Sequence, residues 1–227
     1  MEKQLSKRLE RVASFVQKGQ GLLDVGSDHA YLPIFLVEKG LVPFAIAGEV
    51  VEGPFQSAQK NVAKHGLTDK IQVRLASGLQ AYQEADQVSN LVIAGMGGRL
   101  IADILAADLA KASRFDRLIL QPNNREDELR IWLCQHGFKI EAEVILEEAG
   151  KIYEILQVTP GPMQLTDLEV RFGPFLMEEK SPVFVQKWEK EKAKLKWALD
   201  QIPEGHAASR KDLELKIKAI EEVLHVS

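Results

Sequence analysis

The stretch "LLDVGSDHAYLP", residues 22–33, has the outline of the strand, turn and helix that open a nucleotide-binding fold. Its strand leads through an acid to Gly26, where a missing side chain lets the backbone approach a ligand. A dinucleotide-binding loop would continue with two further glycines, which admit a pyrophosphate at the helix N-terminus. Here Asp28 and Ala30 stand in those places. Because the Asp28 carboxylate would repel a pyrophosphate, we expect a cofactor without phosphates.

Outward from this stretch, short apolar runs alternate with helical ones. We expect strands at 21–26, 44–50, 71–76, 89–98 and 116–123, and helices at 31–40, 53–66, 99–112 and 125–137. This alternation predicts a mostly parallel sheet with helices on both faces. Residues 138–160 hold two more strand-like runs, which we expect to form a hairpin at the end of the sheet. Seven strands in this arrangement predict an α/β, Rossmann-like fold of the class I methyltransferase type.

The composition changes beyond residue 160. We expect an irregular bridge over 161–182, followed by two long charged helices separated by the break "PEGHA". Their apolar stripes predict an antiparallel helical hairpin of coiled-coil type, with structural packing alone as an alternative role. We therefore divide the chain into a cofactor-binding domain, 1–160, and a linker with a helical hairpin, 161–227. We expect the three tryptophans to pack within the protein: Trp132, Trp188 and Trp197.

Composition narrows the class of protein. The chain has 227 residues, 45% of them hydrophobic, which suffices for one domain with a full core and a small appendage. The lone Cys134 cannot form an internal disulfide, so we expect a cytoplasmic protein. The sequence predicts neither a signal peptide nor a membrane span. The net charge of −4 argues weakly against a nucleic-acid-coated protein but permits a local basic face, such as the N-terminal helix.

The ends of the predicted strands supply a candidate cofactor site. Glu49 ends the second strand, 23 residues after Gly26, where an acid can accept both ribose hydroxyl protons; an ordinary strand-end acid is the alternative. Ser77 and Gly78 follow the third strand, where class I methyltransferases usually contact adenine. The glycines of 94–98 free the backbone to approach a ligand, or simply form a tight turn. The predicted cofactor-binding residues are Asp24, Gly26, Ser27, Glu49, Val50, Ser77, Gly78, Leu79, Gly95, Met96 and Gly97.

Four stretches together resemble the bacterial TrmK family of tRNA adenine-N1 methyltransferases, which modify adenosine 22. They are "DVGSDHAYLP", "AGEVVEGPFQSA", "VIAGMGGRLI" and "LILQPNNREDELRIWL". The resemblance covers about residues 1–160, and the C-terminal hairpin fits it. It implies S-adenosyl-L-methionine as methyl donor, S-adenosyl-L-homocysteine as product and tRNA as substrate. Residues 94–98 lack the Asn/Asp-Pro-Pro-aromatic motif of exocyclic-amine methyltransferases, which favours a different target atom.

The chemistry of this reaction selects candidate catalytic residues. Adenine N1 has a free lone pair at neutral pH, so the enzyme must chiefly hold it in line with the sulfonium methyl. Methylation leaves a positive charge on the base, which a carboxylate would stabilise. We predict Asp28 in this role, with His29 and Tyr31 orienting or stacking on the base. An alternative is that Asp28 only holds the cofactor. Because N1 lies on the Watson–Crick edge, the base must be exposed before it reacts.

Substrate contacts are predicted outside the opening loop as well. Arg8 would reach the site if the first helix folds over the pocket, and Asn123 would either bind a base edge or cap the next helix. The predicted substrate-binding residues are Arg8, Gln121, Pro122, Asn123, Lys187 and Lys190. We expect no metal, no membrane partner and a monomer. Three rivals remain: a small-molecule methyltransferase, a nicotinamide-dependent oxidoreductase, and a non-catalytic adaptor whose hairpin binds a protein.

Overall fold

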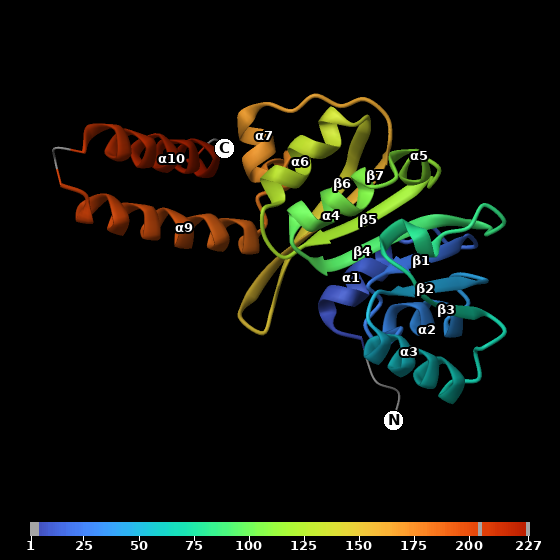
Figure 1. The fold of residues 1–227 in the computed structure, drawn as a ribbon. Coiled ribbons are helices and arrows are strands. Elements are labelled where there is room, and N and C mark those ends of the chain that lie inside the picture. The colour runs from blue at the N-terminus through green and yellow to red at the C-terminus, as the bar shows by residue number, and fades with distance from the viewer. Residues whose placement is uncertain (1–4, 204–205, 226–227) are drawn as a thin grey trace.

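A seven-stranded sheet forms the centre of the computed structural model, which describes residues 5–203 and 206–225 (Figure 1). Its strands are β1 Gly21–Val25, β2 Ala45–Glu49, β3 Ile71–Leu75, β4 Val88–Met96, β5 Arg117–Pro122, β6 Phe138–Glu148 and β7 Lys151–Pro160. They lie in the order β3-β2-β1-β4-β5-β7-β6, and β1 to β5 run parallel while β7 is antiparallel to both β5 and β6. The predicted fold class and terminal hairpin are thereby confirmed.

Helices cover both faces of the sheet. One face carries α1 Lys7–Phe15, α2 Tyr31–Glu38 and α3 Glu52–Lys64; the other carries the 3₁₀ helix η1 Gly78–Ala81, α4 Gly98–Ala106, α5 Leu109–Ala112 and α6 Glu126–Gln135. Successive side chains of a strand point to opposite faces, so Leu22 packs in the first core and Leu23 in the second. This is why the central strands read as continuous apolar runs rather than as alternating ones.

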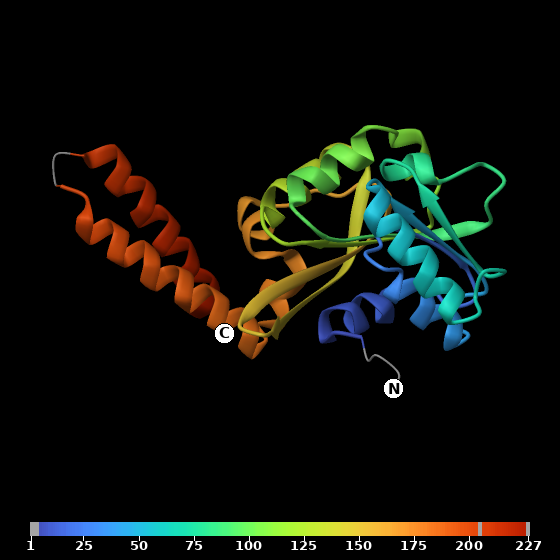
Figure 2. The same cartoon turned by 60° about the horizontal axis from the view of Figure 1, so that its bottom comes forward.

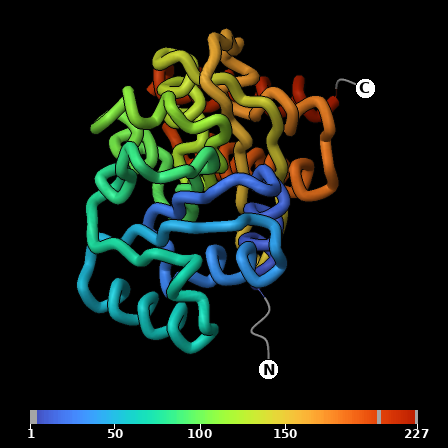
Figure 3. The backbone as a smooth tube through the Cα atoms, turned by 90° about the vertical axis from the view of Figure 1, so that its right-hand side faces the viewer, coloured from blue at the N-terminus to red at the C-terminus, as the bar shows by residue number. Residues whose placement is uncertain are grey.

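The strand order reverses between β1 and β4. Strands β2 and β3 lie on one side of this pair, and β5, β7 and β6 lie on the other. Figure 3 shows that the two sides of the sheet come from the two halves of the chain. Most of the blue to teal, N-terminal segments lie in the lower half of the view, and most of the orange to red, C-terminal segments lie in the upper half. Ligands of open α/β sheets bind at the carboxyl ends of the strands at such a reversal. The fold therefore directs attention to the loops after β1, β2, β4 and β5.

The C-terminal helices extend away from the sheet. α9 Pro182–Gln201 and α10 Ala207–His225 run antiparallel and project from the body (Figures 1 and 2). At their root, Phe184 and Trp188 of α9 pack with Ile220 of α10 and with Ile145 of β6. The predicted helical hairpin is thus present. The start of α9 and the end of α10 form its root, which is part of a small separate core.

Three expectations from sequence are wrong in detail. The bridge is not irregular, because it contains α7 Asp167–Phe172, which a capping box at Thr166 begins, and α8 Pro174–Glu179. The single helix expected over 99–112 is two helices, because Asp108 caps a new one with its side chain. Trp197 does not pack, since it is 68% exposed. The division of the chain at residue 160 stays a prediction. No helix within the described residues is long and apolar enough to span a bilayer.

Candidate active site

The loop after β1 is a left-handed turn. The φ angles of Asp28, His29 and Ala30 are 42°, 67° and 57°. Left-handed backbone costs roughly 1–2 kcal/mol for a residue with a side chain, so neighbouring groups must hold the loop. Asp28 donates its backbone N–H to Glu49 Oε1 at 2.6 Å, and Asn61 donates to the His29 carbonyl at 2.7 Å. Strain held in this way is common at functional sites.

Gly26 lies where the ends of three strands meet. Its φ is 70°, and a Cβ atom on it would lie 2.3 Å from Met96 Cε at the end of β4. The backbone N–H groups of Gly26 and Ser27 donate to the carbonyl of Gly48 in β2, at 2.9 and 3.3 Å. The Met96 methyl group can move aside, so it is the left-handed backbone at this position that favours glycine over residues with a side chain. The close approach of a ligand that was predicted for Gly26 stays a prediction.

Asp24 is a buried carboxyl group beneath this loop. Only 4% of the residue is exposed, and Ser27 Oγ donates to Asp24 Oδ2 at 2.6 Å. Burial raises the pKa of Asp24 to about 7; the Ser27 hydrogen bond and the Arg8 charge oppose this rise, whereas the Glu49 charge adds to it. Asp24 is therefore poised to change protonation state near neutral pH, as is common in active sites.

Glu49 and its neighbours suit the adenosine part of the expected cofactor. Glu49 is 6% exposed, and burial raises its pKa while backbone hydrogen bonds from the β1 loop oppose the rise. Beyond it, Val50 and Val51 are 62% and 61% exposed, and Leu75 at the end of β3 is 48% exposed. A buried carboxylate that can accept ribose hydroxyls thus borders an exposed apolar rim that can cover a base. These residues fit a nucleoside.

The loop after β3 offers fewer groups to the adenine of the expected cofactor. Ser77 is exposed and precedes the η1 helix, whereas Gly78 is buried with a φ of 53°. Leu79 is 3% exposed and packs in the core, so only its backbone can face a ligand. The adenine contact predicted for this loop stays a prediction.

The ends of β4 and β5 form a corner built around Gly95. The register between the strands shifts at this glycine, which makes it a β-bulge with a φ of 80°. Gln121 Oε1 accepts the Gly95 N–H at 3.0 Å, and Asn123 Nδ2 donates to the Gly95 carbonyl at 2.7 Å. Asn123 therefore does not cap α6, whose N-cap residue is Arg125 without a side-chain bond. Gly98 serves packing, because its Cβ would lie 2.3 Å from the Arg125 carbonyl oxygen.

The first helix brings Arg8 to this corner. Arg8 Nη1 donates to Gln121 Oε1 at 2.6 Å, and its guanidinium lies 5.5 Å from the centre of the Tyr153 ring. Gln121 is completely buried and Pro122 is buried, so neither presents its side chain to a substrate, contrary to their prediction as binding residues. Sequence reasoning also missed Tyr153, because a tyrosine in a terminal hairpin carries no local signal for contact with α1.

The three predicted catalytic side chains lie together on the β1 loop and the start of α2. The Asp28 side chain is 84% exposed and that of His29 is 44% exposed, with 3.5 Å between Asp28 Oδ1 and His29 Nε2. The rings of His29 and Tyr31 are 5.3 Å apart and tilted by 34°. The exposed carboxylate and the two rings can therefore meet a docked base together.

The two predicted lysine contacts have different surroundings. Lys187 Nζ contacts Glu154 at 2.6 Å and Glu126 at 3.2 Å. Glu154 also pairs with the fully buried Arg130. Lys187 therefore belongs to a charge cluster at the root of α9, and its contact with tRNA stays a prediction. Lys190 is exposed on α9 and stays a candidate.

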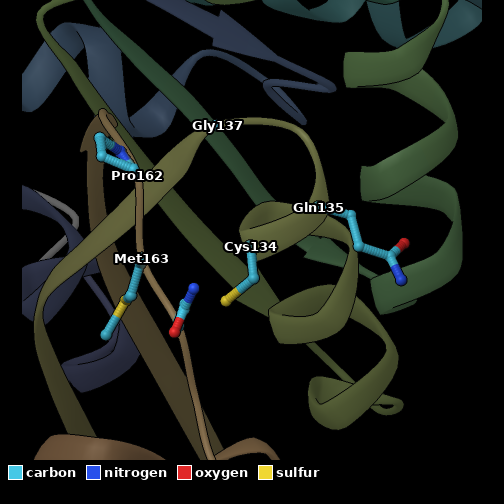
Figure 4. Close-up of a pocket in the computed structure, with 6 residues that line it drawn as sticks. Cys134, Gln135, Gly137, Pro162 and Met163 are labelled. Atoms are coloured by element: carbon cyan, nitrogen blue, oxygen red, sulfur yellow. The ribbon is translucent and has the colours of Figure 1, made fainter.

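Two hollows of the surface lie away from the candidate site. One of about 580 Å³ lies between the end of α6 and the segment after β7, where Cys134 points toward the segment that carries Met163 (Figure 4). Another, of about 440 Å³, borders β3 and α3. Neither of these two hollows includes a predicted site residue.

One family model and several known proteins match most of the chain. The family model TrmK, described as tRNA (adenine(22)-N(1))-methyltransferase, matches residues 22–222. A Bacillus subtilis (strain 168) protein of that same description is 41% identical over 223 residues, 95% of this chain and 92% of the relative. The structure of a candidate tRNA (m1A22) methyltransferase from Streptococcus pneumoniae, in complex with S-adenosyl-L-methionine, is 65% identical with a TM-score of 0.92 and covers 98% of this chain and 100% of that one. That of M. capricolum TrmK with S-adenosyl-homocysteine is 29% identical with a TM-score of 0.86 and covers 96% of each chain.

Proposed function

Because the chain belongs to the TrmK family of tRNA (adenine(22)-N(1))-methyltransferases, we propose that it transfers the methyl group of S-adenosyl-L-methionine to N1 of adenosine 22 in tRNA. One observation carries the proposal most directly. The buried Glu49 carboxylate holds the backbone of Asp28 at 2.6 Å, so the expected ribose acceptor and the candidate catalytic carboxylate form a single constellation. It lies where strand order reverses, at the edge of the sheet that binds ligands in this fold class.

The cofactor would be held by the ends of β1, β2 and β4. Glu49 would accept the ribose hydroxyls, and the exposed Val50 would cover the adenine. Asp24 and Ser27 would be close to the amino and carboxylate groups, with Gly26, Gly95, Met96 and Gly97 as backbone walls. When bound, the cofactor supplies an electrophilic methyl group on a sulfonium. Ser77, Gly78 and Leu79 complete the proposed set.

Asp28, His29 and Tyr31 would act on the target base. As N1 attacks the methyl group, the adenine ring gains positive charge, and the Asp28 carboxylate would stabilise that charge or accept a proton from N6. The rings of His29 and Tyr31 would stack on the base and hold N1 in line. No strong base is needed, because the N1 lone pair is already free at neutral pH.

The helical hairpin would hold the rest of the tRNA. Lys187 of α9 contacts Glu126, the first residue of α6, and α6 follows the carboxyl end of β5 closely. The root of the hairpin therefore lies at the same edge of the sheet as the candidate site. Lys190 on α9 and Arg11 on α1 are exposed cations that could contact phosphates. Given its substrate, we place the enzyme in the cytoplasm.

The proposed activity is tested with two tRNA transcripts that differ only at position 22. With radiolabelled S-adenosyl-L-methionine, we expect label in the adenosine-22 transcript and none when guanosine replaces it. Nucleoside mass spectrometry should then identify the product as 1-methyladenosine. Label at another position, or transfer to a small molecule but not to tRNA, would replace this proposal with a rival.

A further inference from the structure

Gln121 is a buried carboxamide with every hydrogen-bonding position filled. Its Oε1 accepts from Arg8 Nη1 at 2.6 Å and from the Gly95 N–H at 3.0 Å. Its Nε2 donates to the Pro122 carbonyl at 2.8 Å and to Asn123 Oδ1 at 3.1 Å. A carboxamide has two donors and two acceptor sites, so Gln121 has nothing left to offer a substrate. Its function must be exercised through its neighbours.

The donors around Gln121 determine the orientation of two carboxamide groups, those of Gln121 and Asn123. A guanidinium and a backbone N–H can only donate, so Oε1 of Gln121 must face Arg8 and Gly95. Its Nε2 group must then face Asn123, whose Oδ1 accepts the bond. This leaves Asn123 Nδ2 toward the Gly95 carbonyl, to which it donates at 2.7 Å. Each amide has one orientation that satisfies all of these bonds.

The consequence reaches the rim of the candidate site. Asn123 is exposed, and one of its two Nδ2 hydrogens is engaged by Gly95. No acceptor among residues 5–203 and 206–225 engages the second, which lies at the carboxyl edge of the sheet beside the bulge of β4. The network therefore presents an N–H donor, rather than a carbonyl oxygen, to whatever docks there. On adenine, the groups that accept such a donor are ring nitrogens, since the exocyclic amine only donates.

We propose that Arg8 is a positioning residue for methyl transfer, which acts through Gln121 to hold the Asn123 carboxamide with its N–H donor toward a ring nitrogen of the target base. The inference rests on the proposed function and adds a specificity element to it. Arg8 is itself held by the Tyr153 ring, 5.5 Å from the guanidinium. Residues far apart in the chain, on α1, β5 and β7, thus fix one hydrogen-bond donor at the rim.

Arg8 can be changed without removing the helix that carries it. α1 docks through Val12, Ala13 and Val16, which are 0%, 7% and 6% exposed, and its N-terminus is capped by Ser6. These contacts do not involve the guanidinium. Arg8→Met retains most of the aliphatic stem, so we expect the melting temperature to stay close to that of the wild type. Because the Arg8 charge opposes the rise in the pKa of Asp24, tRNA methylation is measured at saturating S-adenosyl-L-methionine.

The test is a double-mutant cycle measured as kcat/KM for tRNA. Arg8→Met should lower this value about tenfold in the wild-type background, because a misplaced contact near the reacting atoms is costly. In the Asn123→Ala background the same change should cost less than about twofold, since the group that Arg8 positions is gone. Arg8→Lys, which keeps a donor toward Gln121, should recover part of the loss.

Arg11→Met is the matched control, because it removes one exposed cation from the same helix. Its effect on kcat/KM for tRNA should be the same in the wild-type and Asn123→Ala backgrounds. Equal losses for Arg8→Met in the two backgrounds would overturn the proposal and indicate a direct phosphate contact. Unchanged kcat/KM in Arg8→Met would overturn it as well. Failure of the proposed function is distinguishable, because the wild-type enzyme would then not methylate the adenosine-22 transcript.

Discussion

At the scale of single residues, the left-handed loop after β1 decides which substitutions are informative. Asp28 has a φ of 42°, and asparagine tolerates this region better than alanine does. Its backbone N–H holds the loop to Glu49. Its side chain is exposed and lies beside the His29 ring. A change confined to the carboxylate therefore separates its chemistry from the shape of the loop.

Asp28→Asn should lower kcat for tRNA methylation by roughly 100-fold, in the range of a lost acid–base or electrostatic contribution. The melting temperature and cofactor affinity should remain close to the wild-type values. A radiolabelled methyl-transfer assay with saturating cofactor measures the change. Asp28→Ala should lose as much activity and some stability. Near-normal turnover in both variants would remove Asp28 from the mechanism.

Glu49→Gln should weaken cofactor binding by about tenfold or more, because a charge-assisted hydrogen bond to a ribose becomes a neutral one. The amide oxygen can still accept the Asp28 N–H, so the loop should keep its shape. Calorimetric titration with S-adenosyl-L-methionine gives the dissociation constant. The exposed Glu52→Gln is the matched control and should bind normally. An unchanged constant for Glu49→Gln would contradict the ribose assignment.

Asp24 predicts how stability depends on pH. Its pKa rises from 3.8 to about 7 on folding, so the neutral form is favoured in the native state. The stabilisation of the native state by this carboxyl group is complete below pH 3.8 and is lost as the pH rises through 7. A pKa shift of this size corresponds to roughly 4 kcal/mol in the free energy of unfolding. Thermal melts of the cofactor-free protein should therefore show Asp24→Asn gaining stability relative to the wild type between pH 5 and pH 8. A constant difference across this range would contradict the assignment.

At the scale of elements, the hairpin has a root and an outer part with different surroundings. The root shares a core with β6 and α7, and Lys187 ties it to the buried pair of Arg130 and Glu154. Farther out, α9 and α10 have few neighbours except each other, and Trp197 is 68% exposed. Deleting all of 182–227 would thus open a core, whereas shortening the hairpin would not.

Replacing residues 197–213 with a short Gly-Ser linker should weaken tRNA binding by at least about tenfold and leave cofactor affinity unchanged. The replacement keeps Phe184, Trp188, Ile220 and Val223 of the root core. Filter binding at several salt concentrations also reports how many phosphate contacts were lost, because the salt dependence should become shallower. Unaltered tRNA affinity would mean that the outer hairpin serves another purpose, such as association with a protein.

At the scale of the whole molecule, sheet order gathers the site from distant parts of the chain. Placing β1 beside both β2 and β4 brings the Asp28 loop against Glu49 and the Gly95 bulge near Gly26. Adding β7 beside β5 brings Tyr153 toward the first helix. The result is a rim to which the N-terminal helix and the last strand of the sheet both contribute.

Local features of the sequence were enough to predict the fold class and the strand ends at which the candidate site lies. Gly26 and Glu49 could be predicted because parallel strands end at one edge, and because a glycine turn and a following acid are local features. The helical hairpin could be predicted from its apolar stripes for the same reason: periodicity is a property of neighbouring residues.

Contacts between elements far apart in the chain could not be predicted in this way. Lys187 and Gln121 look like available polar residues in the sequence, but packing places one in a charge cluster and fills every bond of the other. Nothing local marks Tyr153 or Asn61 as a partner of the site. Hydrogen bonds and ion pairs depend on distances of a few ångströms, and those distances exist only once strands far apart in the chain have taken their order in the sheet.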